Sequence, residues 1–483
     1  PTPDSPLLKI DEVPTRGAND RRIEPALQLT ASTALLCNGN GACHNYDLDD
    51  RMCPSWKATR DRRHTPKGRA GLMREWVTRL SDHGLESIPS LTWTQHLTGM
   101  PGRVLRTLRK ASGKYDFNHE VFEAMSTCLA CKSCTGQCPI KVSVPTFRSH
   151  FLNAYYTRYS RPIKDWIVGT LEYVLPIAAQ MPKAYNSIVE SKIGRWFFTN
   201  LGLVDSPSLS GTDPHRAIAE AGFQVTDVQR LKTLRSDDPE RFSRQVVIVQ
   251  DAFTSYFETQ VVVDLFKLLK LLEFEPTLMP FHPNGKPLHV HGFLGWFKRL
   301  GEANAAKLRL IDEIGVPMVG LDPSMTMTYR SEYKEAQIET PAVLLIQEFI
   351  AQHLVEGRVA SALPVRRFRL FAHCTEATNA KESLSMWKPI FAMAGQSLEI
   401  ESVGCCGMAG TYGHEKSNLD TSKTIYTQSW KPKIEGQDTS DAEILATGYS
   451  CRSQVKRLSD QMVRHPISAL CEVLAAASSQ QLA

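Results

Sequence analysis

Two patterns of apolar residues divide the chain near residue 240. Before that point, apolar side chains recur at the three- and four-residue spacing of helices, whereas after it short β-rich runs alternate with helical stretches. The runs Gln245–Val249, 277–280, 317–321 and 368–372 predict strands, and 261–272 predicts one of the helices between them. Such alternation predicts a mostly parallel sheet. We therefore expect an α+β chain with a helical first part and an α/β second part.

The first part contains several predicted helices. The pattern predicts helices over 66–76, 119–125 and 147–159. A further amphipathic helix, ended by Pro176, is predicted from the spacing of Ile163, Trp166, Ile167, Leu171, Val174 and Leu175. We expect its apolar face in the core or at a domain boundary, with contact to a membrane surface as the alternative. The window 166–181 contains Glu172 and is too short to span a bilayer.

The second part of the chain repeats its own landmarks. Four pairs recur at separations of 123 to 126 residues: Asp251 with Cys374, His282 with Cys405, Met325 with Cys451, and Thr340-Pro341 with His465-Pro466. A nearly constant separation predicts an internal duplication. Only the second copy carries cysteines at these positions.

Composition indicates the class of protein and its compartment. The chain has 483 residues, 42% hydrophobic and 22% charged, with a net charge of +5, which is ordinary for a globular protein of about three domains. Its twelve cysteines cluster with ligand-like spacing, which favours metal binding in a reducing compartment such as the cytoplasm. The first residues resemble no signal peptide and lack an initiator Met, so we expect a processed or later piece of a longer protein.

The strongest chemical signal is Cys128-Leu-Ala-Cys131-Lys-Ser-Cys134-Thr-Gly-Gln-Cys138-Pro139. This spacing is that of bacterial ferredoxins, whose first three thiolates hold one iron–sulfur cluster while the fourth ligates a second cluster. Two residues between cysteines let a tight loop turn three thiolates onto one cluster. A zinc ribbon needs two separated C-x2-C pairs instead. We therefore expect a [4Fe-4S] cluster at this run.

An incomplete copy of this motif precedes it. Cys37 and Cys43 take the first and third positions, Asn40 replaces the middle cysteine, and Cys53 closes the motif before a proline. If the copies exchange their last cysteines, one cluster is held by Cys128, Cys131, Cys134 and Cys53, and the other by Cys37, Cys43 and Cys138. Three thiolates favour a [3Fe-4S] cluster, or a [4Fe-4S] cluster with water, Asn40 or another group on its fourth iron. Alternatively, this copy is vestigial and its cysteines are merely buried.

Basic residues crowd the stretch beside this first motif, namely Arg51, Lys57, Arg60, Arg62, Arg63, Lys67, Arg69 and Arg74. Such a run is expected to be a solvated face, with a docking patch for an acidic partner or an anion as the alternative. The mild overall charge argues against nucleic-acid binding.

The second repeat carries another set of cysteines. Cys374 follows one predicted strand, the pair Cys405 and Cys406 follows the next, and Cys451 follows the last. Because strand-end loops of a parallel sheet gather on one edge, these four thiols are expected to meet. They could hold a metal or a cluster, form a dithiol redox pair, or pack the sheet edge as buried thiols. His373 and His414 are near enough in sequence to be substitute ligands or supporting groups.

The equivalent edge of the first repeat carries Asp251, His282, His289 and His291. We expect solvated loop residues here, with a site for a hard metal ion as the alternative. Cys471 lies in an apolar helical pattern and is expected in the core.

Together, these motifs resemble a known family. A two-motif ferredoxin unit followed by tandem cysteine-rich halves with a Cys-Cys-Gly sequence is similar to the iron–sulfur subunits of glycolate oxidase, anaerobic glycerol-3-phosphate dehydrogenase and heterodisulfide reductase. The chain more closely resembles the C-terminal half of bacterial FAD-linked D-2-hydroxyacid dehydrogenases, particularly the D-2-hydroxyglutarate type. The strings that carry the resemblance are 37–43, 66–70, 128–139, 373–376, 403–415 and 446–454.

The sequence and this resemblance together predict five regions. They are a linker at 1–30, a ferredoxin-like iron–sulfur domain with a helical insertion at 31–150, a helical connector at 151–240, a degenerate cysteine-rich repeat at 241–365, and a second repeat with the Cys-Cys-Gly sequence at 366–483. The chain departs from the broader family at Asn40, in the cysteine-free first repeat, and where the closing C-x2-C has become Cys451-Arg-Ser-Gln454.

The resemblance implies that a flavin domain oxidises D-2-hydroxyglutarate to 2-oxoglutarate and passes electrons singly into the clusters. No glycine-rich dinucleotide fingerprint follows a strand here, so we expect the substrate and FAD sites in a partner domain or subunit, outside this chain.

The expected acceptor is a quinone or an electron-transfer protein. We expect at most peripheral membrane contact, at the inner face of the membrane. The sequence also allows a homo-oligomer. Alternatives are an iron–sulfur subunit of a glycolate or glycerol-3-phosphate dehydrogenase, a heterodisulfide-reductase-like complex and, remotely, a nucleic-acid-binding iron–sulfur protein.

Overall fold

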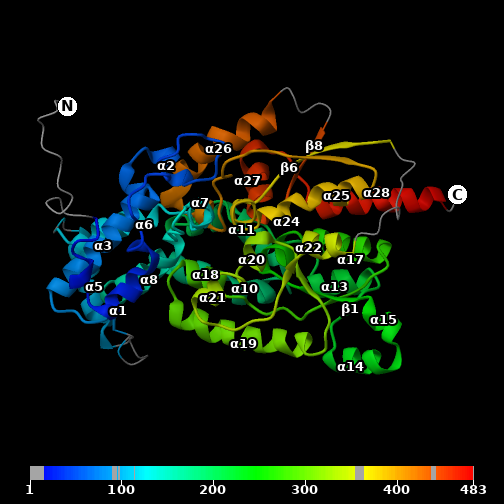
Figure 1. The fold of residues 1–483 in the computed structure, drawn as a ribbon, viewed down its shortest axis with the longest axis horizontal. Coiled ribbons are helices and arrows are strands. Elements are labelled where there is room, and N and C mark those ends of the chain that lie inside the picture. Colours follow the sequence, from blue (N-terminus) through cyan, green and yellow to red (C-terminus); the bar gives the residue numbers. More distant parts are fainter. Residues whose placement is uncertain are drawn as a thin grey trace, which may run out of the picture.

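A computed structural model describes residues 16–89, 95, 98–111, 113, 115–353, 364–436 and 442–481. Figure 1 shows a helical part, drawn in blue, beside a larger part in which helices surround two sheets. The chain is thus a mixture of helices and parallel sheets, which confirms the α+β prediction at this level.

The helical part is built from seven helices within the described residues. They are α1 (Pro25–Ala31), α2 (Pro54–Thr59), α3 (Pro66–Asp82), α5 (Met100–Ala111), α6 (Phe117–Ser126), α7 (Ser133–Gln137) and α8 (Val144–Arg158). The predictions at 66–76, 119–125 and 147–159 are confirmed by α3, α6 and α8. Their shared core is aromatic, and the Trp76 and Phe151 rings pack edge to face at 5.0 Å.

The prediction of a linker over 1–30 is wrong for its last residues, which form a helix. Residues 1–15 lie outside the described part, but Pro25–Ala31 forms α1, with Pro25 in the first turn and Leu27 and Ala31 fully buried. These two side chains lie four residues apart and face α3 and α8, so packing rather than intrinsic propensity forms this short helix.

The first part of the connector, to residue 200, contains four helices after α8, whereas one long helix was predicted at its start. They are α9 (Ile163–Gly169), α10 (Leu171–Ala178), α11 (Pro182–Glu190) and α12 (Lys192–Asn200). The predicted helix is broken at Thr170, and Pro176 lies inside α10 rather than ending it. No helix in the described residues is long and apolar enough to cross a bilayer.

The prediction that the apolar face of this segment is buried is wrong for three residues. Ile163, Trp166 and Val174 are 62%, 47% and 48% exposed, whereas Leu175 is buried. The inner side also carries Glu172, whose carboxylate accepts hydrogen bonds from two backbone amides of the first repeat. Because these hydrogen bonds place Glu172 on the inner side, part of the apolar stripe faces solvent.

The sheets lie in the second part and are parallel throughout. After α13 (Pro214–Glu220), the first contains β1 (Gln224–Val225), β2 (Gln245–Val249), β3 (Glu275–Leu278), β4 (Met318–Gly320) and β5 (Leu344–Leu345), in the order β1-β3-β2-β4-β5. The second contains β6 (Arg367–Phe371), β7 (Ser397–Ile400) and β8 (Ala442–Ala446), in the order β7-β6-β8. The four predicted strands correspond to β2, β3, β4 and β6.

The two sheets share a local plan. The order β3-β2-β4 in the first matches β7-β6-β8 in the second. Gln245 and Arg367, which begin β2 and β6, are 122 residues apart, and Met318 and Ala442, which begin β4 and β8, are 124 apart. Each central strand therefore has equivalent neighbours, and the loops at the carboxyl ends of β6, β7 and β8 carry the cysteines.

Helices surround both sheets. Around the first are α14 (Val228–Asp237), α15 (Pro239–Ser243), α16 (Ala252–Phe257), α17 (Thr259–Leu271), α18 (Lys286–Val290), α19 (Leu294–Asp312), α20 (Pro323–Thr326), α21 (Glu332–Glu335) and α22 (Ile346–Gln352). Around the second are α23 (Cys374–Asn379), α24 (Lys381–Ser385), α25 (Trp387–Met393), α26 (Leu419–Glu435), α27 (Tyr449–Ser459) and α28 (Pro466–Gln481). α17 packs against α28, and one apolar core spans both sheets. Cys471 is buried in that core, as predicted.

Candidate functional site

The ferredoxin-type loop is shaped by residues with left-handed backbone conformations. Ala130 and Lys132 have φ angles of 55° and 56°, a conformation that non-glycine residues rarely adopt. These two reversals curl the loop, and its first three cysteines line a cavity of about 300 Å³. Strain at these positions fits a loop that must aim several side chains at one centre.

Cys53 of the first motif lies in the same cavity. It too is left-handed, with φ 42°, and its Sγ lies 3.2 Å from the His64 carbonyl oxygen. Burial raises the pKa of the Cys53 thiol, Arg69 opposes this rise, and the nearby Cys128 adds to it. Burial, Cys128 and Cys53 together raise the pKa of Cys134 to about 12, against the opposition of local hydrogen bonds. The structure therefore groups Cys53 with the second motif.

Arg69 provides the positive charge at this cavity. It is 1% exposed, and its Nη1 lies 3.7 Å from Cys53 Sγ. Its other contacts are neutral oxygens, and no ion pair to it is found among the described residues. A buried guanidinium without a carboxylate is costly unless another anion balances it. Thiolates, or the cluster that they would hold, supply that anion.

The predicted solvated face is therefore only partly correct. Arg60, Arg62 and Arg63 are exposed, but Lys57 and Arg69 are buried. Lys57 Nζ lies 3.7 Å from Asp50, whereas Arg69 turns toward the cysteines. Helical periodicity explains the difference, because Arg69 shares the inward side of α3 with Met73 and Trp76.

The other cysteines of the two motifs lie close by. Cys37 and Cys43 are buried, and the Lys67 amide donates to Cys43 Sγ at 3.4 Å. Burial raises the pKa of the Cys43 thiol, the Lys67 amide opposes this, and Cys53 and Cys37 add to it. Cys138 is partly buried and packs against the apolar core of the helical part, which also contains Cys37 and Cys43.

The side chain of Asn40 is directed at its own loop. It is exposed, and its carbonyl oxygen accepts from the Ala42 amide at 2.9 Å while its amide donates to Asn38 at 3.0 Å. These local bonds leave it poorly placed to replace the missing middle cysteine.

Four thiols meet at the edge of the second sheet. Cys374 begins α23 after β6, Cys405 and Cys406 follow β7, and Cys451 lies in the first turn of α27 after β8. All are at most 4% exposed. Cys405 contacts Cys374 and Cys406, and Cys406 also contacts Cys451. Gly407, with φ +85°, follows the pair in a turn that L-residues rarely adopt.

The thiols of this group differ in proton affinity. Hydrogen bonds from Cys405 and Cys451 hold the pKa of Cys406 well below its usual range. The same contacts raise the pKa of Cys405 and Cys451, because a proton donated to a thiolate is held more tightly. Burial lowers the pKa of the neighbouring His373. A single thiolate held by two thiols is a suitable starting point for metal binding, which removes the remaining protons.

A second, partly buried cation, Arg51, lies within electrostatic range of His373 beside this thiol group. Its Nε and Nη2 atoms are buried without a hydrogen-bond partner, and its charge acts on both His373 and Glu376. Like Arg69 at the first cavity, it is a cation without a carboxylate partner among the described residues. In the described ranges, no three His, Cys, Asp or Glu side chains are already arranged as a site for one metal ion.

The two cysteine groups face one cavity of about 820 Å³. Its lining includes Cys128 and Cys131 from the first group and Cys374, Cys405 and Cys406 from the second. Burial strongly raises the pKa of Cys131, and Cys374 and Cys134 add to the rise. Cys131 therefore lies between the two groups.

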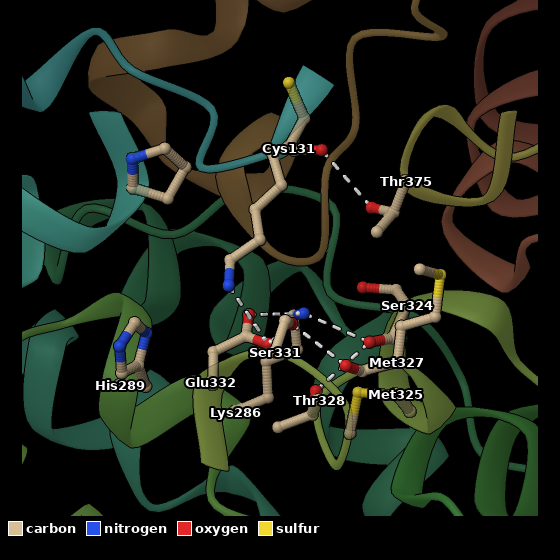
Figure 2. Close-up of polar contacts among 12 residues, drawn as sticks. Cys131, Lys286, His289, Ser324, Met325, Met327, Thr328, Ser331, Glu332 and Thr375 are labelled. Carbon is tan, nitrogen blue, oxygen red and sulfur yellow. Dashed lines mark hydrogen bonds and ion pairs between the residues drawn. The ribbon is translucent and has the colours of Figure 1, made fainter. Parts of the chain in front are cut away.

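Direct contacts join the ferredoxin-type loop to α23. The Thr375 hydroxyl donates to the Cys131 carbonyl oxygen at 3.2 Å, as Figure 2 shows, and the Asn379 amide donates to the Lys132 carbonyl oxygen at 3.3 Å. Gly136 permits this approach, because a Cβ there would lie 2.2 Å from the Thr378 carbonyl oxygen. We call this contact between α7 and α23 the loop junction.

A buried ion-pair network lies beneath the loop junction. Lys132 Nζ lies 3.3 Å from Glu332 and 3.1 Å from Glu335, and Lys286 lies 2.9 Å from Glu332. Figure 2 shows Lys286 and Glu332 bonded together beneath Cys131. Residues 332 and 335 therefore contribute carboxylates beside the ferredoxin-type loop, whereas residues 374, 405 and 406 contribute thiols to the cavity that this loop lines.

The expectation of solvated residues at the edge of the first repeat is wrong. Asp251, His289 and His291 are 7%, 5% and 4% exposed, and only His282 is partly open, with Lys307 2.9 Å away. Burial lowers the pKa of His289 to about 3, so it is neutral. They are covered because the helical part and connector lie over this edge, with His291 3.6 Å from Asp165 and His289 3.4 Å from Ser149.

His414 is also buried rather than placed with the thiols. Its ring lies 3.1 Å from the Val204 carbonyl oxygen in the connector. His373, by contrast, lies directly before Cys374, and its Nδ1 accepts from the Thr375 amide at 3.2 Å. His373 is thus the histidine that the structure places with the thiol group.

Sequence reasoning missed the individual roles of Arg51, Arg69, Lys132 and Glu332. Lys132 was visible as a charged residue between two cysteines, and Arg69 as the arginine of the string 66–70. Their charge partners come from distant parts of the chain, so no local pattern could identify them.

Comparison with known proteins gives a consistent result. The chain is 45% identical over 473 residues to a D-2-hydroxyglutarate dehydrogenase of Pseudomonas putida, covering 96% of this chain and 46% of that protein. It is 43% identical over 480 residues to the Escherichia coli K12 protein of the same name, covering 98% and 46%. The chain thus spans about half the length of the curated relatives it matches.

A weaker match is to one of the subunits of the anaerobic glycerol-3-phosphate dehydrogenase of Escherichia coli K12. The identity is 24% over 243 residues, which is 49% of this chain and 60% of that protein. No family model and no solved structure matches the chain.

These matches correct one expectation. We expected the substrate and FAD sites outside this chain, yet proteins that carry the dehydrogenase name match it along 96–98% of its length. Their names apply to polypeptides of about twice this length, and the matches assign the substrate site to neither part. The expected placement of these sites therefore has no support.

Proposed function

We propose that this chain is the iron–sulfur electron-transfer part of a D-2-hydroxyglutarate dehydrogenase, equivalent to the C-terminal half of its longer relatives. The relatives at 39–45% identity carry that name, and the anaerobic glycerol-3-phosphate dehydrogenase subunit aligns with about half of the chain. The observation that carries the proposal is the position of Cys131 and Cys374, from two separate cysteine groups, on the walls of one cavity. Two adjacent redox centres would form a path for electrons.

The residues around the first cavity fit an iron–sulfur cluster. Cys128, Cys131, Cys134 and Cys53 line a space of about 300 Å³, and Arg69 offsets negative charge there. The Ala130 amide lies 3.4 Å from Cys128 Sγ, and such hydrogen bonds to sulfur help to set a cluster's potential. We assign a [4Fe-4S] cluster to these four cysteines.

A second cluster, of the [4Fe-4S] or [3Fe-4S] type, would use Cys37, Cys43 and Cys138. Lys67 supports this assignment, because its amide donates to Cys43 Sγ and its Nζ donates to the Gly39 carbonyl oxygen. Lys67 thus donates a hydrogen bond to one of the three cysteines and holds the loop between Cys37 and Cys43.

The thiols at the Cys-Cys-Gly sequence are better explained as ligands of a metal or cluster than as buried side chains that only pack the edge of the sheet. The four soft ligands contact one another in a row, from Cys374 through Cys405 and Cys406 to Cys451, and the positive charge of Arg51 acts on the neighbouring His373. Cys374, Cys405, Cys406 and Cys451 would be the ligands, with His373 as a neutral neighbour.

Bound clusters would take up and release one electron at a time, which suits a two-electron donor such as reduced FAD. The protein groups fix the cysteines and supply positive charge. The loop junction holds the two cysteine groups at a fixed separation. A quinone or an electron-transfer protein would be the final acceptor.

The strand orders support the proposed domain plan. The match between β3-β2-β4 and β7-β6-β8 favours duplicated cysteine-rich repeats over 241–365 and 366–483, preceded by the ferredoxin-like domain and the connector. All twelve cysteines are free thiols, which favours a reducing compartment such as the cytoplasm.

A second candidate is an iron–sulfur subunit for glycerol-3-phosphate oxidation. It rests on the weaker match over 243 residues. The substrate that reduces the clusters separates the two candidates.

A hybrid enzyme tests the proposal. This chain replaces the matched region of the Escherichia coli relative, and the purified hybrid is mixed anaerobically with D-2-hydroxyglutarate or glycerol-3-phosphate. Electron paramagnetic resonance (EPR) should show reduced clusters with D-2-hydroxyglutarate alone. Clusters that dithionite reduces but D-2-hydroxyglutarate does not would contradict the proposed function.

A further inference from the structure

The connector exposes an unusual number of large apolar side chains. Within residues 163–200 they are Ile163, Trp166, Val174, Ile177, Met181, Ile188, Ile193, Trp196 and Phe197. The described residues after 200 are far more numerous, yet they expose only five such side chains. Single exposed apolar residues are normal, but a contiguous group marks a surface that binds something.

The densest part of this group belongs to α11 and α12, which pack against each other. Met181 directly precedes α11, Ile188 lies near its end, and Ile193, Trp196 and Phe197 lie on one side of α12 at three- and four-residue spacing. These five side chains are 68%, 58%, 80%, 69% and 52% exposed. We call them the connector patch.

The inner sides of the two helices fix this orientation. Val189 is buried, and the Asn186 side chain exchanges hydrogen bonds with the Leu209 backbone at 2.7 and 3.0 Å. Gly194 is buried against the end of α11, where a Cβ would overlap the Ile188 carbonyl oxygen. Because these contacts occupy the inner sides, the connector patch faces solvent and is available to an occupant.

We propose that the connector patch is the docking surface for the part of the longer dehydrogenase that this chain does not match. The inference rests on the proposed function, because it takes the chain as equivalent to one half of its relatives. Those relatives match 96–98% of this chain, yet the matched region is only 46% of their length. A further part of similar length therefore belongs to the same polypeptide, and such parts commonly meet through an interface with an apolar centre.

The position of the connector patch supports this occupant. Directly after α12, the Val204 amide donates to the His414 carbonyl oxygen at 2.7 Å, and the Gly202 carbonyl oxygen accepts from the Lys416 amide at 2.9 Å. Between these two partners, Glu415 lines the cavity that both cysteine groups share. A protein part on the connector patch would therefore lie near the wall of this cavity, where electron transfer requires a partner to approach.

The surroundings of the connector patch favour a folded protein part over a membrane. Lys192 and Arg195 are exposed on α12, and the exposed Glu190 ends α11. Charges of both signs around an apolar centre form the polar rim typical of a protein interface. A helix that lies in a bilayer surface buries one amphipathic face along its length, whereas α11 and α12 are two nine-residue helices separated at Ser191.

Hydroxyl-radical footprinting, which reads the exposure of individual side chains, tests the inference. It compares the chain alone with the hybrid enzyme, in which the chain replaces the matched region of the Escherichia coli relative. We expect Trp196 and Met181 to be oxidised at least about fivefold more slowly in the hybrid, because an interface excludes water from its centre. Met462, which follows α27 and is 76% exposed, should be oxidised equally in both. A second hybrid, built on the Pseudomonas putida relative, provides an independent measurement.

Ile193→Glu in the hybrid should restore the oxidation of Trp196 toward its rate in the chain alone, because a charge enters the apolar centre. Leu310→Glu is the matched control, because Leu310 is 48% exposed on α19 and the change in charge is the same. It should leave Trp196 protected. Circular dichroism would verify that each variant is folded, as expected for substitutions at exposed positions.

Three results would overturn the inference. Equal oxidation of Trp196 in the chain and in the hybrids would show that the further part does not cover it. Protection that is lost on dilution would assign the connector patch to a second copy, and protection that requires added lipid vesicles would assign it to a membrane.

These oxidation rates do not depend on the dehydrogenase reaction. Failure of D-2-hydroxyglutarate to reduce the clusters of a hybrid with protected Trp196 would contradict the proposed function alone. Unprotected Trp196 in a hybrid whose clusters are reduced would contradict this inference alone.

Discussion

Lys132 Nζ lies 3.3 Å from a carboxylate oxygen of Glu332, and both side chains are almost fully buried. Lys132 stands between Cys131 and Cys134 in the ferredoxin-type loop, whereas Glu332 belongs to the first repeat. Nearby carboxylates outweigh burial and raise the pKa of Lys132, so its charge is retained. The repeat without cysteines thus fixes a positive charge beside the proposed cluster.

Removing that charge should lower the potential of the cluster. In Lys132→Met the more negative reduced state loses its cation, and a shift of several tens of millivolts is expected at an effective dielectric constant of about 20. Lys132→Arg keeps the charge and should stay near the native potential. Glu332→Gln should shift the potential upward. An EPR-monitored redox titration measures all three, and an equal shift in Lys132→Met and Lys132→Arg would argue against a charge effect.

The grouping of Cys53 with the second motif predicts which substitutions remove the complete cluster. Cys53→Ser should lose the cluster assigned to Cys53, Cys128, Cys131 and Cys134, with about four irons per chain, as completely as Cys128→Ser does, because both cysteines line the same cavity. Cys471→Ser, in the apolar core, should retain this cluster. Iron analysis with EPR measures the outcome, and native iron content together with the native EPR spectrum in Cys53→Ser would show that the last cysteines are not exchanged.

The loop junction predicts that Gly136 tolerates no side chain. Gly136→Ala would place a Cβ 2.2 Å from the Thr378 carbonyl oxygen, so the loop or α23 must move. We expect a loss of about 1–3 kcal/mol in the free energy of unfolding. Gly295→Ala is the control, because a Cβ at that helical position meets nothing within 4 Å. Denaturant unfolding compares the two, and similar stabilities would show that the junction is looser than described.

Glu172 predicts a pH dependence of stability. Burial raises its pKa to about 7, against the opposing hydrogen bonds from the Gly285 and Asn284 amides. In an unfolded chain the same group titrates near pH 4.3. Because the folded state holds the proton more tightly, this contribution is complete below about pH 4.3 and is lost as pH rises to about 7. The contribution is on the order of 3 kcal/mol.

Glu172→Gln should therefore flatten the stability profile between about pH 4.3 and about pH 7. Thermal unfolding of native protein and variant across this window measures the difference. Glu190→Gln, at an exposed position on α11, provides a comparison with the same chemical change. Parallel profiles for native protein and Glu172→Gln would contradict the raised pKa.

Much of the fold could be read from local patterns. The apolar run Gln245–Val249 is β2 with unchanged bounds, because a fully buried strand leaves a continuous apolar signal. The four thiols of the second repeat could be expected to meet, because strand-end loops of a parallel sheet share an edge. Sequence reasoning was sufficient where the spacing of residues along the chain determined the positions of strands and strand-end side chains.

Other features depended on distant contacts. The exposure of Trp166 follows from the way Glu172 anchors α10 to the first repeat, which no helical period reveals. The same is true of Arg69, whose partners come from Cys53, Ser55, Ala124 and Thr127. Charge on a helix was visible in the sequence, but the side that faces inward was decided by packing.

The most direct test of the account is iron and acid-labile sulfide analysis with EPR on the chain purified without oxygen. We predict a coloured protein with at least about four irons and matching sulfide per chain, and an EPR signal from a reduced cluster after dithionite. Cys128→Ser should contain about four fewer irons per chain than the native protein. A colourless, iron-free native protein that stays so after anaerobic reconstitution with iron and sulfide would contradict the account.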